Sequence, residues 1–180
     1  MKVLVFDTEC TSLLSKTGDN DNFHILQLSY IVYDTITKVS EETDFILKSP
    51  VKILNSDIHG ITDEMSAMGY DFSEIVNIFL EDVENVDLII AHNLNFDLNA
   101  LELELYRLEM DDDIDKLFEK PFYCTMKMGI GVISPRYPKL CDLYFYYFNK
   151  KFENAHNAIF DVRATIACYL KLTENEVLLC

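Results

Sequence analysis

Short apolar runs of strand length alternate with longer segments of helical periodicity along most of this chain. Runs at 2–6 and 25–34 are rich in β-branched and aromatic residues, and 42–48 continues the pattern, so we expect three strands, the last two forming a hairpin. The order of all elements predicts an α/β domain with a central mixed five-stranded sheet flanked by helices. The remaining predicted elements are strands at 87–92 and 121–126 and helices at 71–84, 94–108, 140–148 and 159–170.

Two segments are predicted to be irregular, because Gly, Pro, Ser, Asn and Asp gather in them. They are residues 14–22 and 49–70. The acidic run at 111–115 lacks the glycine and glutamate that a calcium loop needs, so we expect a turn there. The length of 180 residues favours a single domain spanning 1–180.

The net charge of −16 is unevenly distributed. Residues 1–115 hold 6 basic and 25 acidic residues, whereas 116–180 hold 9 basic and 6 acidic ones. This balance excludes a polybasic coat for long nucleic acids and argues against an anionic membrane partner. The C-terminal third is predicted to carry a local, salt-sensitive strand-binding track. Its expected members are Lys116, Lys120, Lys127, Arg136, Lys139, Lys150, Lys151 and Arg163.

Cysteine usage and the absence of long apolar runs bear on the cellular compartment. The five cysteines are odd in number and contain no C-x-x-C pair, which predicts neither a disulfide framework nor a zinc site. No apolar run approaches 18 residues, and the first residues lack a leader pattern. We therefore expect a soluble, cytoplasmic protein without a membrane partner.

Two carboxylates close the first predicted strand. Asp7 and Glu9 are two residues apart, so they project from the same face as Val3 and Val5. Two neighbouring carboxylates repel each other unless a cation lies between them, and Mg²⁺ prefers oxygen ligands. A D-x-E pair at a strand end is therefore a candidate metal seat.

Further candidate residues follow later in the chain. Asp97 lies near the start of a predicted helix, where an acid suits the helix dipole and where Asn95 is a suitable N-cap. Asp161 lies five residues after His156, a spacing that places the two on different helix faces. We expect His156 in the preceding loop or first turn and Asp161 inside the helix, on a side with small residues that allows close approach to a strand.

Three motifs in order, VFDTECTSL, AHNLNFDLNAL and AHNAIFDVRAT, resemble those of the DEDDh (DnaQ-like) 3′→5′ exonuclease family. That family includes the epsilon subunit of DNA polymerase III, ribonuclease T and the TREX enzymes. SDIHGIT at 56–62 and YPKLCDLYFYYF at 137–148 resemble two further family segments. The resemblance spans nearly the whole chain and implies a ribonuclease H-like fold.

The resemblance implies a catalytic set of Asp7, Glu9, Asp97, His156 and Asp161. Asp7 would bridge two Mg²⁺ ions, for which Mn²⁺ can substitute. Glu9 and Asp161 would hold the first ion, and Asp97 would reach the second. His156 would act as general base in a two-metal hydrolysis that releases nucleoside 5′-monophosphates from a 3′ end.

The resemblance also implies a set of substrate-binding residues. The backbone after the first motif and two apolar residues would contact the terminal nucleotide, although Leu13 and Ile61 are equally suited to core packing. His92 is expected to support the second motif instead. Cys10 and Ser12 depart from the family's D-x-E-T-T-G pattern, and a Cβ at Ser12 restricts a backbone that could need positive φ. The full set is Thr8, Cys10, Thr11, Leu13, His59, Ile61, Asn93 and Phe96.

Several functions are compatible with these sequence features. The leading hypothesis is a metal-dependent 3′→5′ exonuclease favouring single-stranded or frayed DNA 3′ ends, with a polymerase or replication protein as a further partner. An exoribonuclease or oligoribonuclease is the alternative, because the same metal centre serves both and the 2′-OH alone discriminates. A non-catalytic nucleic-acid-binding module is disfavoured because all four carboxylates and the histidine are present. Proofreading, turnover and oligonucleotide degradation all fit, and the sequence favours no oligomeric state.

Overall fold

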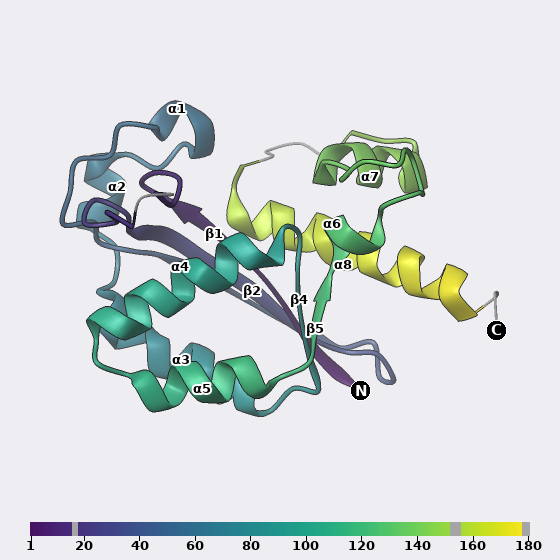
Figure 1. Ribbon diagram of the computed structural model, residues 1–180, viewed down its shortest axis with the longest axis horizontal. Coiled ribbons are helices and arrows are strands. Elements are labelled where there is room, and N and C mark those ends of the chain that lie inside the picture. Colours follow the sequence, from purple (N-terminus) through teal and green to yellow (C-terminus); the bar gives the residue numbers. More distant parts are fainter. Residues whose placement is uncertain (16–17, 152–155, 178–180) are drawn as a thin grey trace.

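The computed structural model describes residues 1–15, 18–151 and 156–177. These residues form a five-stranded sheet in the order β3-β2-β1-β4-β5 (Figure 1). β1 pairs with β2 and β2 with β3 in antiparallel fashion, whereas β4 lies parallel to both β1 and β5. The predicted mixed sheet is therefore confirmed. The strand bounds are β1 Lys2–Cys10, β2 Ile25–Asp34, β3 Ser40–Ile46, β4 Leu88–Ala91 and β5 Phe122–Cys124.

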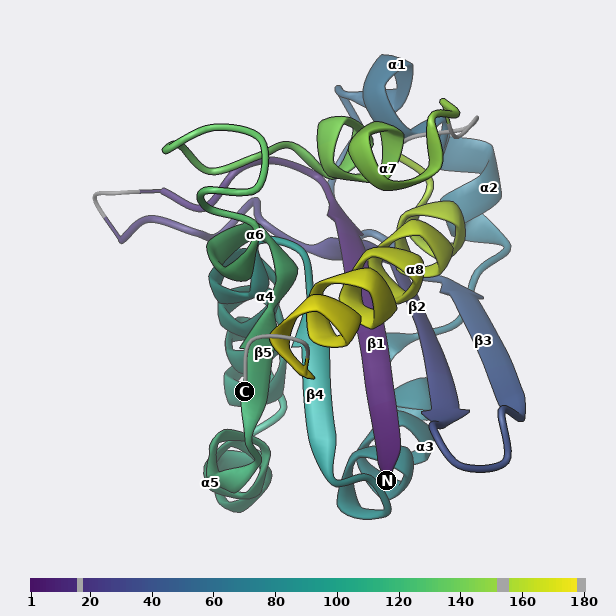
Figure 2. The same ribbon diagram turned by 90° about the vertical axis from the view of Figure 1, so that its right-hand side faces the viewer.

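Helices cover both faces of this sheet (Figure 2). Alternate side chains of β1 divide between the faces: Leu4 and Phe6 belong to the large core with α3 and α4, whereas Val3 and Val5 pack with residues of α8. α7 packs on α8 through Leu143. The bounds are α3 Phe72–Glu84, α4 Leu94–Arg107, α7 Leu140–Phe148 and α8 Ala158–Val177.

Three parts of the sequence prediction were wrong. The acidic run expected as a turn begins α5 (Asp111–Glu119), because three aspartates in a first turn favour the positive end of the helix dipole. The segment expected to be irregular contains α1 (Ser56–His59) and α2 (Asp63–Ala67), which are too short to show helical periodicity. The end of the expected fifth strand is α6 (Thr125–Met128).

β1, β4 and β5 all run in one direction, so their C-terminal ends lie at the same end of the sheet. This end of the strands is called here the C-terminal edge of the sheet, to distinguish it from the outermost strands. β4 leads into α4 and β5 into α6 at this edge, and α1 lies over the same end (Figure 1). The opposite edge carries α5 and the start of β1 (Figure 2). The first edge thus gathers the second half of β1 and the N-terminus of α4.

The described cysteines are Cys10, Cys124, Cys141 and Cys168, and all four are free. Cys180 lies outside the described residues, as does Ala155 at the start of the third motif. Among the described helices, none combines the length and the apolar character needed to cross a bilayer.

Candidate functional site

Asp7 and Glu9 lie in the second half of β1, which extends farther than the sequence predicted. Asp7 is opposite Ser29 and Glu9 opposite Gln27 in the antiparallel ladder with β2. Both carboxylates therefore project from the face that α8 covers, as do Val3 and Val5. The strand thus presents a pair of acids at the edge where α4 and α8 also begin.

Asp97 lies in the first turn of α4 and is almost fully buried, with 2% of its surface exposed. Its Oδ1 accepts a hydrogen bond from the Thr8 backbone N–H at 3.0 Å and another from the Thr8 hydroxyl at 2.8 Å. α4 begins at Leu94 with Asn93 as N-cap, in the left-handed region at φ 64°, so the expected cap at Asn95 was wrong. Thr8 therefore ties the second motif to the strand that carries the first.

The third motif brings His156 and Asp161 to the same place. His156 precedes α8 with φ at +67°, and Asp161 lies inside the helix, as the spacing predicted. The His156 N–H donates to Asp161 Oδ2 at 2.9 Å. One side-chain donor atom from each of Glu9, His156 and Asp161 lies within 4.8 Å of the other two. Mixed carboxylate and imidazole donors at such distances can hold a metal ion.

The four carboxyl groups share an environment that disfavours their charge. Burial raises the pKa of Asp7 well above its ordinary value, and repulsion by Asp97, Asp161 and Glu9 raises it further. Burial and the same kind of repulsion raise the pKa of Glu9 to about 8. For Asp97, burial outweighs the hydrogen bonds from Thr8 and raises the pKa to about 7. Burial also raises the pKa of Asp161 to about 6. A divalent cation would stabilise the ionised form of these carboxyl groups and so lower their pKa values.

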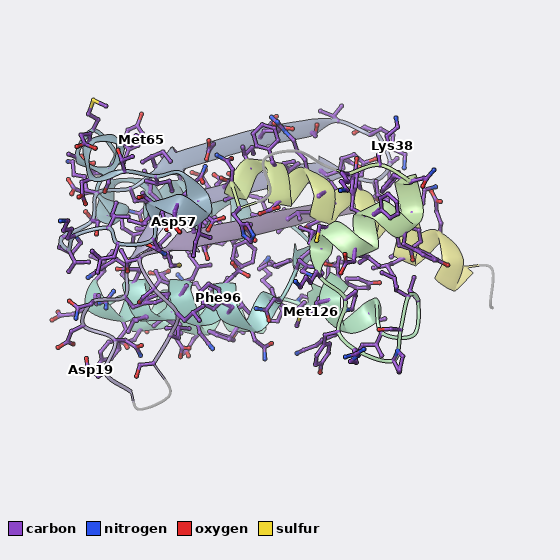
Figure 3. All side chains as sticks on the ribbon, turned by 90° about the horizontal axis from the view of Figure 1, so that it is seen from above. Asp19, Lys38, Asp57, Met65, Phe96 and Met126 are labelled. Carbon is purple, nitrogen blue, oxygen red and sulfur yellow. The ribbon has the colours of Figure 1, made fainter. Side chains whose placement is uncertain are left out.

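A first cavity of about 560 Å³ opens beside these acids. It is of a size that binds small ligands or nucleotides. Asn93 and Phe96 of the predicted substrate set border it, and Figure 3 shows Phe96 between Asp57 of α1 and Met126 of α6. The cavity is lined by Asp7, Thr8, Glu9, His92, Asn93, Phe96, Asp97, Met126, Tyr137, Pro138, Lys139, Leu140, Cys141, His156 and Asp161.

A second cavity of about 570 Å³ shares Thr8, Glu9, Phe96 and His156 with the first. Its remaining lining residues come from the segment after β1 and from α1 with the residues before it. Glu9 and His156 thus lie where the two cavities meet, and Asp7, Asp97 and Asp161 border the first cavity beside them. The remaining lining residues are Cys10, Thr11, Ser12, Leu13, Leu54, Asn55, Ile58 and His59.

The two apolar residues expected to contact a terminal base separate in the structure. Leu13 is 82% exposed and lines the second cavity. Ile61 is 1% exposed and packs with Leu26 and Ile53, so the prediction that it contacts substrate was wrong. Ile58 lies three residues earlier in α1, is 54% exposed and lines the second cavity instead. The sequence did not separate these two isoleucines, because Gly60, at φ 77°, turns the chain between them.

Two polar atoms of residues lining the second cavity stand out. His59 is 5% exposed, and its Nδ1 accepts a hydrogen bond from the Ile61 N–H, so the neutral ring carries its proton on Nε2. Within the described residues, His59 Nε2 and Asn55 Oδ1 are buried without a hydrogen-bond partner. Asn55 Nδ2 donates to the Cys10 carbonyl at 2.9 Å. Buried polar atoms without a hydrogen-bond partner are rare in folded proteins.

The residues after the first motif are held by the protein itself. The Thr11 hydroxyl donates to the Asn22 carbonyl and accepts from the His24 N–H, which fixes the loop before β2. Cys10 packs in the large core, and burial raises the pKa of its thiol. Ser12 does not belong to the residues with positive φ in the described part of the chain. Serine in place of glycine therefore causes no strain at this position.

His92 lies within the second motif, and its ring hydrogen bonds are with later segments and not with other residues of that motif. One ring nitrogen lies 2.9 Å from the Thr125 hydroxyl and the other 3.2 Å from the Pro138 carbonyl. Burial lowers the pKa of His92 to about 4, so the ring is neutral at physiological pH. His92 joins the end of β4 to the segments that follow β5.

The basic residues of the C-terminal third do not form the single track that was expected. Lys120 donates to the carbonyls of Glu84 and Val86 at the opposite edge of the sheet, and Lys116 pairs with Asp113 on α5. Arg163 pairs with Glu42 on β3. Lys139 alone among the eight lines the first cavity. Charge counts along a chain do not report where side chains gather in space, and this part of the prediction was wrong.

Proteins of known family resemble this chain in sequence. The family model described as "Exonuclease" matches residues 4–169. The DNA polymerase III epsilon subunit of Pasteurella multocida is 24% identical over 181 residues, covering 94% of this chain and 67% of that protein. The chain thus spans about two thirds of the length of this relative.

Solved structures share the fold. Exonuclease X in complex with 5′ overhanging duplex DNA superposes with a TM-score of 0.67 at 16% identity, covering 96% of this chain and 92% of that one. A 3′-exonuclease that recognises the 3′ end of a histone mRNA stem-loop gives a TM-score of 0.69 at 11% identity, covering 97% and 82%. Because the family model matches residues 4–169, a span that includes the four acids of the three motifs and His156, the chain belongs to the exonuclease family and is an enzyme of the 3′→5′ exonuclease class.

Proposed function

We propose that this chain removes nucleoside 5′-monophosphates from the 3′ ends of nucleic acid, with single-stranded DNA favoured, in a reaction that needs two divalent metal ions. The observation that carries the proposal is the convergence of four carboxylates and His156 at one cavity, with Glu9 and His156 also bordering a second. The epsilon relative and the exonuclease X complex support DNA as substrate. The epsilon relative also supports a polymerase as partner, which stays a prediction.

The donor set fits hard divalent cations. Four buried carboxylates with raised pKa values favour a compensating positive charge, and oxygen donors are those that Mg²⁺ and Mn²⁺ prefer. We assign Asp7 to both ions, Glu9 and Asp161 to one, and Asp97 to the other. Two such ions would supply charge stabilisation at the attacking and leaving oxygens.

His156 is positioned to accept the proton of the attacking water. Its side chain is exposed toward the two cavities and lies beside Glu9 and Asp161. Imidazole groups ordinarily exchange protons near neutral pH, which suits a general base. The His156 backbone N–H donates to Asp161. Asp161 would therefore both bind an ion and hold the residue that carries the base.

The second cavity is suited to the terminal nucleoside. Leu13 and Ile58 line it and offer exposed apolar surface against which a base can stack. The first cavity, with Tyr137 and Lys139 at its border, then takes the preceding nucleotides. The scissile phosphate would lie between the two cavities, beside the four carboxylates.

A digestion experiment tests the proposal. A single-stranded DNA labelled at its 5′ end should shorten one nucleotide at a time with Mg²⁺ or Mn²⁺, and excess chelator should stop the reaction. Matched RNA, duplex and mismatched duplex strands in parallel establish the preferred substrate. Fragments produced by internal cutting, or intact strands with either metal, would contradict the proposal.

Removing or adding the metal should change stability in a pH-dependent way. Glu9, Asp97 and Asp161 have folded-state pKa values of about 8, 7 and 6, above the ordinary value of about 4 for an unfolded carboxyl group. Between these limits the folded protein binds more protons than the unfolded chain, so its stability falls as pH rises. The melting temperature of metal-free protein should therefore decrease from pH 5.5 to pH 8.5.

Mg²⁺ or Mn²⁺ should reverse this trend, because the ligands must lose their protons to bind and deprotonated ligands are more abundant at high pH. The metal-induced rise in melting temperature should be larger at pH 8.5 than at pH 5.5. Differential scanning calorimetry with and without chelator measures both effects. An equal metal effect at both pH values would show that these carboxylates are not the ligands.

A further inference from the structure

A row of polar side chains crosses the sheet face that α8 covers. In the antiparallel ladders Glu9 lies opposite Gln27, and Ser29 lies opposite Asp44. Opposed residues and residues two apart project from the same face, so all four side chains lie on the α8 side. The row runs from the proposed metal ligand Glu9 on β1 to the edge strand β3.

Gln27 is the central member of this row and is 1% exposed. Its Nε2 donates to Asp44 Oδ1 at 2.8 Å, and its Oε1 accepts from the Ala158 N–H at 3.2 Å. A buried amide is costly unless both of its ends find partners, and here both do. Gln27 thus connects the edge strand to the first residue of α8.

Asp44 determines which way the Gln27 amide points. A carboxylate only accepts hydrogen bonds, so Gln27 directs its NH₂ group toward Asp44. The carbonyl oxygen is then directed at Ala158. The Ser29 hydroxyl also donates to Asp44 Oδ1, at 2.7 Å, and so holds the carboxylate in place.

The bond to Ala158 provides a partner for a helix-end N–H group that no intrahelical acceptor can satisfy. Helices usually obtain such a partner from a side chain of the residue just before them. Asn157 occupies that position, but among the described residues its Oδ1 is buried without a partner. Gln27 provides this partner from the sheet, which fixes the helix start relative to the sheet.

This anchor lies inside the segment that carries the proposed base and metal ligand. Ala158 follows His156 by two residues and precedes Asp161 by three. His156 has φ at +67°, a conformation that is unfavourable for a non-glycine residue and persists only where the surroundings hold it. The His156–Asp161 bond holds one side of the segment, and Gln27 holds the other.

We propose that Gln27, oriented by Asp44, is a positioning residue that sets the start of α8 and thereby holds His156 and Asp161 against Glu9. This inference rests on the proposed function of those three residues. Gln27 is neither a proposed metal ligand nor a proposed substrate-binding residue. It acts through the backbone of α8.

The main test compares Gln27→Met with wild type. Methionine has a similar size and shape but makes neither hydrogen bond. At a temperature where the variant is fully folded by circular dichroism, kcat should fall by about 10- to 100-fold with little change in KM, because a misplacement near 1 Å is sufficient for such a loss. The His156 ring signals in a ¹H–¹³C spectrum should also shift or broaden relative to wild type.

Asp44→Ala provides the second variant, because Asp44 lies at the exposed edge strand and its loss leaves the core packing intact. It should lower kcat and perturb the His156 signals in the same direction, since the Gln27 amide then loses its fixed orientation. Glu42→Gln is the matched control. It weakens another contact between β3 and α8, the ion pair with Arg163, without touching Ala158, and should leave both readouts near wild type.

The outcomes separate this inference from the proposed function. A folded Gln27→Met or Asp44→Ala protein with kcat within twofold of wild type and unchanged His156 signals would overturn the positioning role. If wild type degrades no strand, the proposed function fails, and the His156 signals of the three variants still decide whether Gln27 sets the start of α8. Equal losses in Glu42→Gln would show a general effect of β3–α8 contacts and would also overturn the inference.

Discussion

Asp97→Asn is expected to reduce nuclease activity by about 10³-fold or more while the fold stays intact. The loss follows because a carboxylate that stabilises a divalent cation contributes several kcal/mol to the transition state, and each 1.4 kcal/mol is a factor of ten. Asparagine keeps an oxygen where Thr8 donates its two hydrogen bonds, so only the charge and the metal ligand are removed. Steady-state digestion of a labelled strand, at saturating Mn²⁺, measures the loss.

Binding and stability measurements make this test specific. Calorimetric titration with Mn²⁺ should show weaker binding in Asp97→Asn than in wild type. The melting temperature of the metal-free variant should be equal to or above that of wild type, because one of four repelling carboxylates is gone. Asp112→Asn, in an exposed acid of α5 at the opposite edge, is the control and should retain full activity. More than a tenth of wild-type activity in Asp97→Asn would contradict the assignment.

His156→Ala is expected to reduce kcat by about 10²- to 10⁴-fold, the usual contribution of a positioned general base. In contrast to Asp97→Asn, this variant should bind Mn²⁺ with nearly wild-type affinity, because the proposed metal ligands are carboxylates. His156 is exposed beside both cavities, so added imidazole can reach the space that the side chain leaves. Partial recovery of the rate with millimolar imidazole would support proton transfer as the lost step.

Two measurements on His156→Ala separate the base from a ligand. If the rate and the Mn²⁺ affinity fall together, His156 binds metal. This outcome has to be tested because His156 lies close to Glu9 and Asp161. An unchanged rate would remove His156 from the mechanism altogether. The Mn²⁺ affinity therefore distinguishes His156→Ala from Asp97→Asn even if neither variant degrades a strand.

The sequence predicted the sheet and the long helices because their apolar spacing reports directly which residues are buried. α3 is the clearest case, with Ile75, Val76, Phe79, Leu80 and Val83 buried at helical spacing after an Asp71 capping box. α1 and α2 escaped prediction because four or five residues contain little more than one turn. α5 was missed because the acidic run at 111–115 was expected to be a turn, whereas its acids stabilise the first turn of the helix.

The residues of the candidate site were likewise only partly predictable from the sequence. The order and types of the acids and of His156 were visible in the sequence, because they follow recognisable strand and helix ends. The bonds from Thr8 to Asp97 and from Gln27 to Ala158 join residues 89 and 131 positions apart, and only the strand register and helix placement bring them together. Ile58 was missed for a similar reason, since one helical turn decides which of two nearby isoleucines faces a cavity.

The carboxylates come from a strand and from two helices, whereas much of the border of the two cavities comes from connecting segments. Changes in the length or composition of the segments after β1 and before α7 therefore need not displace any carboxylate. Substrate preference and hydrolytic chemistry can vary independently in such an arrangement. For protein engineering, this makes residues 11–14 and 129–138 the natural region for exchanging loops to alter specificity while keeping the same reaction.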